Sequence, residues 1–221
     1  MIERRYRTAE LLWTAGLFGF SILFVAAMIV GKWPNYWVYI ASEMTPMTWW
    51  ESMVLFACCL FALLNAFLIF IQNGYSRRVL IWFLLAAAFF FLTLDERFAL
   101  HERVRDNWLA PRDVKLLPWV GAGDFLLLLY AIIGLVFLRY LFRELQLRKA
   151  AVRWFIAGAA AGAFAVILDS FDVSKMSLAK ERLEQTVEEV FELGAMLAFL
   201  LAFSLITSTM LQRIIKPHKK E

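Results

Sequence analysis

Residues 52–71 read SMVLFACCLFALLNAFLIFI, a stretch without a charged side chain. About 20 apolar residues in an α-helix are enough to cross the hydrocarbon core of a bilayer. Comparable stretches recur along all 221 residues, 62% of which are hydrophobic, and the mean hydropathy is +0.66. The sequence therefore predicts an all-α integral membrane protein with a single transmembrane domain, residues 1–221.

Six segments are long enough to span the membrane. They lie at about 11–31, 48–71, 79–95, 118–138, 154–170 and 188–211. The first follows three arginines, as a signal peptide does, but its apolar core of about 20 residues exceeds the usual 7–15. We therefore expect it to be retained, which gives a six-helix bundle with both termini on the same side.

Lys and Arg residues set the orientation, because they are enriched in short cytoplasmic connections. With the termini inside, 14 of the 23 Lys and Arg residues face the cytoplasm. By contrast, 15 of the 19 Asp and Glu residues lie outside. The sequence thus predicts a multi-pass protein of the inner (plasma) membrane, with an acidic cluster facing the periplasm or exterior. The net charge of +4 reflects this topology and anionic lipid headgroups, and no nucleic-acid partner is expected.

The acidic residues concentrate at the predicted outer ends of the helices. Ionisable groups at membrane depth are costly, so they normally face a bundle interior, a water-filled cavity or a partner. Small residues share the helix faces that carry several of these acids, which predicts that the faces pack together. We therefore expect a divalent metal site whose candidate ligands are Glu51, Asp95, His101, Asp169, Glu188 and Glu192.

Such a ligand set suits Zn, Mn, Fe, Mg or Ca, depending on its geometry. Glu96 and Glu189 are the candidate catalytic residues, because a carboxylate that does not bind the metal can act as a general base. No other cofactor-binding motif is found. The adjacent residues Cys58 and Cys59 are expected only to pack. The alternative is a network of salt bridges with Arg97, Arg103 and other basic residues of the same layer.

Two strings carry a resemblance to a group of proteins. LTLDERFALHE at 92–102 and VEEVFELG at 187–194 resemble motifs of uncharacterised bacterial polytopic membrane proteins. In that group an acidic pair at the end of one helix precedes His-Glu, and a later helix opens with Glu-Glu. The resemblance implies the six-helix plan and supplies no activity.

Three classes of function follow from the cluster. The first is a metal-dependent membrane hydrolase or transferase acting on a lipid-linked substrate at the outer leaflet, with 96–106 and 175–187 as a rim over its cavity. The second is a structural or assembly subunit of a larger membrane complex, or a homo-oligomer. The third is a cation transporter or channel, for which a polar path past Asn65 would be needed.

Overall fold

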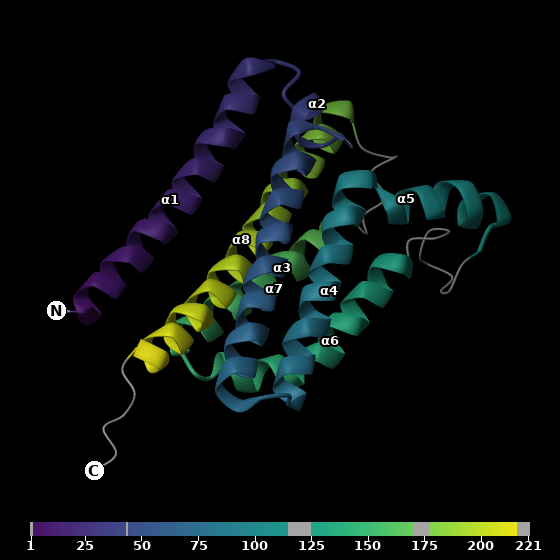
Figure 1. Cartoon of the computed structure of the whole chain (residues 1–221). Helices are drawn as coiled ribbons and strands as arrows, with labels where there is room; N and C mark the ends of the chain where they lie inside the picture. The colour runs from purple at the N-terminus through teal and green to yellow at the C-terminus, as the bar shows by residue number, and fades with distance from the viewer. Residues whose placement is uncertain (1, 43, 115–124, 170–176, 216–221) are drawn as a thin grey trace, which may run out of the picture.

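The structure is a computed structural model that describes residues 2–42, 44–114, 125–169 and 177–215 (Figure 1). These residues form helices and no strand. The elements are α1 Ile2–Gly31, α2 Trp37–Ile40, α3 Pro46–Asn73, α4 Arg77–Phe98, α5 Leu100–Val104, the π-helix η1 Arg105–Leu109, the 3-10 helix η2 Ala110–Arg112, α6 Phe125–Leu145, α7 Lys149–Asp169 and α8 Leu178–Ile215. The all-helical prediction is confirmed for these parts of the chain.

Five of the described helices are long and apolar enough to cross a membrane. Their spans are Arg4–Gly31, Pro46–Asn73, Arg77–Phe98, Lys149–Leu168 and Leu178–Ile215. These helices indicate a multi-pass membrane protein. The predicted span 118–138 begins outside the described residues, and α6 covers its later part before continuing to Leu145. Six crossings therefore stay a prediction.

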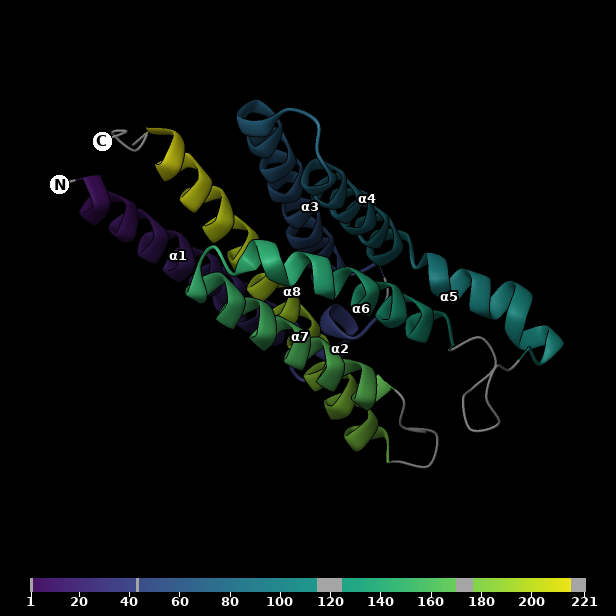
Figure 2. The ribbon, with the colours of Figure 1, turned by 90° about the horizontal axis from the view of Figure 1, so that it is seen from below.

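The long helices alternate in direction, so that the bundle has two distinct ends (Figures 1 and 2). The start of α1 and the end of α8 lie at one end, which we call the terminal end. The starts of α3 and α8 and the end of α4 lie at the opposite end, which we call the carboxylate end. The cation–π contact of Arg182 with Trp37, 3.4 Å from the ring centroid, ties α2 to α8 at the carboxylate end.

Helices α3, α4 and α8 enclose the core. Trp82 and Phe89 of α4 pack edge-on against Phe203 of α8, with ring centroids 5.5 and 5.3 Å apart. Cys58 and Cys59 are buried free thiols, and Cys58 Sγ lies 3.8 Å from the Met196 carbonyl oxygen. The expected packing role of the cysteines is thus confirmed.

Asn65 joins α3 to α8 in the middle of the bundle. Its side chain is fully buried, and its Nδ2 donates to the Phe203 carbonyl at 3.3 Å. The Thr207 hydroxyl donates to Asn65 Oδ1 at 2.8 Å. Both halves of the amide are therefore used in holding the two helices together.

Two bidentate arginine–glutamate pairs fasten the terminal end. Arg148, in the link before α7, donates from both Nη atoms to Glu10 of α1, and Ser208 of α8 donates to the same carboxylate at 2.6 Å. Arg78 of α4 donates to Glu144 of α6 at 2.7 and 2.6 Å. Fork-to-fork pairs of this kind are strong and directional, so Glu10 and Glu144 are each matched by an arginine.

Helices α7 and α8 cross closely at Gly158. A Cβ at this position would lie 3.0 Å from the Ala195 carbonyl oxygen and 3.0 Å from Phe199 Cε1. Small residues let helices approach in lipid, where no hydrophobic force drives them together. The predicted small-residue face of this helix is therefore a packing face, at least at Gly158.

The chain after α4 is helical but broken. The sequence 95–106 predicts that the helix continues, because no breaker occurs before Pro111, and α5 and η1 are indeed helical. The helix is not continuous, however, since α4 ends at Phe98 and Ala99 takes the left-handed conformation with φ 47° and ψ 50°. The Asp95 carboxylate explains the break, since its Oδ1 accepts the backbone N–H of His101 at 2.7 Å and so favours a new helix start. The arm made of α5, η1 and η2, Leu100–Arg112, consequently leaves the bundle sideways (Figure 1).

Candidate functional site

The carboxylate end brings together acids from three helices around Glu51. Glu51 is in the second turn of α3, which begins with Pro46, a residue that fits a first turn because it has no N–H to leave unbonded. Its side chain is 0% exposed. The charges that act on it come from Glu189 and Glu192 of α8 and from Glu96 of α4. We call these four residues the Glu51 cluster.

Among the described residues, no counter-charge compensates the burial of Glu51. Neither Oε atom has a hydrogen bond of good geometry there, and the group within reach of it is another acid, the Glu96 carboxyl. A buried carboxylate that is not paired costs several kcal/mol, on the order given for isolated buried ions. Glu51 must therefore hold a proton or lie against a cation.

Glu51 contrasts with two acids at the terminal end. Glu10 and Glu144 each receive two hydrogen bonds from an arginine. The chain thus supplies arginine forks where acids hold helices together, and supplies none to Glu51 within the described residues. The predicted network of salt bridges with the basic residues of the carboxylate end does not include Glu51 within the described residues.

Asp95 and His101 form a separate pair. His101 Nδ1 lies 2.9 Å from Asp95 Oδ2, and the Tyr130 hydroxyl of α6 also interacts with this carboxylate. Burial alone would lower the pKa of His101, but the hydrogen bond and charge of Asp95, together with the charge of Glu102, raise the pKa on balance. The pair fixes the bend between α4 and α5.

The predicted ligands thus divide between two places. Glu51 and Glu192 belong to the Glu51 cluster, as do the predicted catalytic residues Glu96 and Glu189. Asp95 and His101 bind each other. Glu188 is half-buried on α8, and the side chain of Asp169 lies outside the described residues. Within the described part of the chain, no three His, Cys, Asp or Glu side chains are arranged as a group that could hold a metal ion.

Salt bridges satisfy the acids of the arm. Arg105 donates to Glu102 at 3.2 Å and to Asp106 at 2.8 Å. Arg103, two positions earlier, lies 3.9 Å from the Met44 sulfur and pairs with no carboxylate of the described residues. The sequence predicts Arg103 only as a salt-bridge partner of the acidic cluster. A count of charges does not show which arginine lacks a carboxylate partner in the folded chain.

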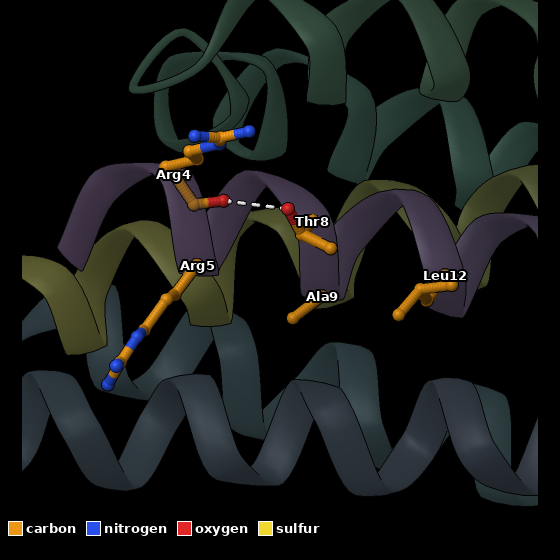
Figure 3. A pocket seen from close by; sticks show the side chains of 5 residues that line it. All are labelled: Arg4, Arg5, Thr8, Ala9 and Leu12. Atoms are coloured by element: carbon orange, nitrogen blue, oxygen red, sulfur yellow. Dashed lines mark hydrogen bonds between the residues drawn. The ribbon is translucent and has the colours of Figure 1, made fainter. Parts of the chain in front are cut away.

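Among the described residues, two hollows lie outside the Glu51 cluster. One, of about 430 Å³, runs along the start of α1 and is lined by Arg4, Arg5, Thr8, Ala9 and Leu12 (Figure 3). Arg4 and Arg5 point to opposite sides of the helix there. Basic side chains beside apolar ones are typical of a helix entering a membrane from an anionic headgroup layer, so we assign this hollow no further role. The other lies against His101, and acids do not line it.

In the described parts of the chain, fold and site define a helical membrane protein in which the buried Glu51 carboxyl group has no cationic partner. Residues 17–207 match the family model described as Domain of unknown function (DUF8692). The chain belongs to this family, and the matched stretch includes the whole Glu51 cluster as well as Asp95 and His101. Comparison with curated proteins finds no match, and comparison with solved structures finds none either.

The Asp95–His101 pair predicts a pH-dependent contact. We expect His101 to titrate above its ordinary value of 6.5. The Asp95–His101 contact then contributes fully to the stability of the folded state below about pH 6.5, and this contribution is lost as the pH rises through the raised pKa of His101. The His218→Asn variant leaves His101 as the only histidine of the chain, so imidazole NMR shifts will report its midpoint alone. Adding Asp95→Asn should lower that midpoint, and an unchanged midpoint would contradict the pairing.

Proposed function

We propose that this protein binds a divalent cation within the Glu51 cluster and that the cation serves a membrane-embedded hydrolase or transferase acting on a lipid-linked substrate. The burial of Glu51 without a partner among the described residues supports this proposal. Carboxylates from α3, α4 and α8 supply the hard oxygen ligands that divalent cations such as Mg²⁺, Ca²⁺ and Mn²⁺ bind.

Metal binding requires the side chains of the cluster to move. The described side chains do not form a group of three metal ligands. The carboxyl groups of the cluster therefore have to move closer together around the ion, or the Asp169 carboxylate has to serve as an additional ligand. A bound cation would polarise a substrate oxygen or acidify a water molecule. Glu96 or Glu189 would then accept a proton, because each neighbours Glu51.

The proposal includes an orientation. We infer six crossings, with the terminal end in the cytoplasm and the carboxylate end at the outer face of the inner (plasma) membrane. The excess of Lys and Arg in the predicted inner connections supports this orientation. The position of the start of α1 and the end of α8 at one end of the bundle agrees with it.

Metal analysis of the purified protein tests the proposed function. After loading with each candidate ion and removal of the excess, we expect about one ion per chain, and we expect Glu192→Gln to lose it. Glu181→Gln removes the same charge from the first turn of α8, outside the Glu51 cluster, and should keep the ion. Asp95→Asn shows whether this predicted ligand belongs to the same site. Absence of every tested ion from the unsubstituted protein would refute the proposal.

Cation transport has less support than catalysis. A transport path would need free polar groups in the inner half of the bundle, and the one candidate on α3, Asn65, is fully buried and bonded to α8 on both sides of its amide.

A further inference from the structure

We propose that the hollow beside His101 is a binding site for one phospholipid molecule, with the headgroup phosphate held by Arg103. This inference is independent of whether the Glu51 cluster holds a cation. The hollow has a volume of about 450 Å³, within the range of small-molecule sites. Its lining residues come from α4, α5, η1 and α6 and are Phe91, Leu100, His101, Arg103, Val104, Asn107, Trp108 and Tyr130.

The lining has the chemistry of an amphipathic ligand. Its apolar part consists mainly of aromatic and branched side chains, among them Phe91, Val104 and Trp108. Its polar part consists of the Arg103 guanidinium, the Asn107 amide and the His101 imidazole, none of which is acidic. Such a lining suits an anionic headgroup attached to a hydrocarbon chain.

Arg103 is the cation best placed to meet that headgroup. No carboxylate of the described residues pairs with it, whereas Arg105 on the same arm is matched by both Glu102 and Asp106. The guanidinium of arginine binds phosphate oxygens through two parallel N–H groups. His101 Nδ1 is engaged with Asp95, which leaves Nε2 as the ring nitrogen for the ligand.

The position of the arm favours a lipid as the source of the phosphate. The arm leaves the bundle where α4, a candidate membrane span, ends, and it carries exposed apolar residues such as Val104, 44% exposed, and Trp108, 67% exposed. Arg112 stacks on the Trp108 ring at 5.9 Å. Tryptophan beside arginine is typical of segments lying at the membrane–water interface. An arm at that interface would place the hollow at the depth of phospholipid headgroups.

Native mass spectrometry of the full chain in a maltoside detergent tests the site. We expect a one-to-one adduct with phosphatidylglycerol or phosphatidic acid. Diacylglycerol with the same acyl chains and inorganic phosphate should each bind at least about tenfold more weakly, because each lacks one half of the ligand. Equal binding of diacylglycerol would show an apolar groove only, and equal binding of inorganic phosphate would show a free-anion site. Either result overturns the proposal.

Matched variants locate the adduct. Arg103→Gln should weaken phospholipid binding about tenfold, as the loss of a charge-assisted contact does. Arg105→Gln removes the same charge from the same arm without touching the lining and should have less than about a twofold effect on this scale. Val104→Trp fills the hollow from an exposed position and leaves every charge in place, so it should abolish the adduct in a protein that elutes normally from gel filtration. Equal losses in both arginine variants, or full binding by Val104→Trp, would overturn the assignment.

Discussion

Glu51→Met is expected to unfold at a higher temperature than the unsubstituted protein when both are kept in a chelator. Methionine has a similar length and no charge, so the substitution removes a fully buried carboxyl group that has no hydrogen-bond partner among the described residues. The expected gain is on the order of 1–3 kcal/mol in the free energy of unfolding.

An added divalent cation should reverse this order of stabilities. A ligand that binds only the folded state stabilises it in proportion to its concentration over its dissociation constant, so the unsubstituted protein should gain stability from the ion and Glu51→Met should gain little. Thermal unfolding in detergent, followed by circular dichroism, measures both effects, and Glu181→Gln serves as a charge control. A loss of stability in Glu51→Met under chelator would mean that favourable contacts hold the carboxyl group, against our interpretation of the site.

Gly158→Ala is expected to destabilise the protein by about 1–3 kcal/mol, as overpacking of a tight contact does. The new methyl group would lie 3.0 Å from the Ala195 carbonyl oxygen, and a backbone atom of a long helix cannot move aside alone. Phe199, the other close neighbour, is held between Phe89 and Phe155, at centroid distances of 6.2 and 5.2 Å. Helices α7 and α8 therefore have to separate.

Gly162→Ala, one turn further along α7, is the matched control. Its methyl group would be 3.6 Å from the Ala195 Cβ, which is ordinary van der Waals contact. Both variants gain the same helix propensity, up to about 1 kcal/mol, so their difference in unfolding free energy isolates the steric effect. Equal melting temperatures for the two variants would contradict the close crossing at Gly158.

The long helices could be predicted from the sequence because lipid leaves little choice of structure. Every backbone group in a bilayer needs an internal partner, so an apolar stretch such as 52–71 is a helix almost regardless of its neighbours. The close helix crossing at Gly158 could also be predicted, because only small residues allow two helices to approach so closely. The burial of Glu51 was also foreseeable from its place at the start of an apolar helix.

The division of the acidic residues could not be predicted in the same way. Helical periodicity places Asp95 on the same face as other acids, but it does not show that the chain turns at Ala99 and brings the His101 imidazole back to within 2.9 Å of Asp95 Oδ2. A left-handed alanine has no sequence signal of the kind that glycine gives. Likewise, a count of charges predicts salt bridges but not which residues form them. It does not show that Arg105 pairs with two acids, Glu102 and Asp106, while Arg103 pairs with no described acid.

The contacts of Glu10 bear on the order in which the protein is made. Its arginine partner comes 138 positions later in the chain and its serine partner 198 positions later. During synthesis the first helix therefore enters the membrane with a carboxylate whose partners have not yet been translated. The contacts of α1 through Glu10 can therefore be completed only after α8 has been synthesised and inserted.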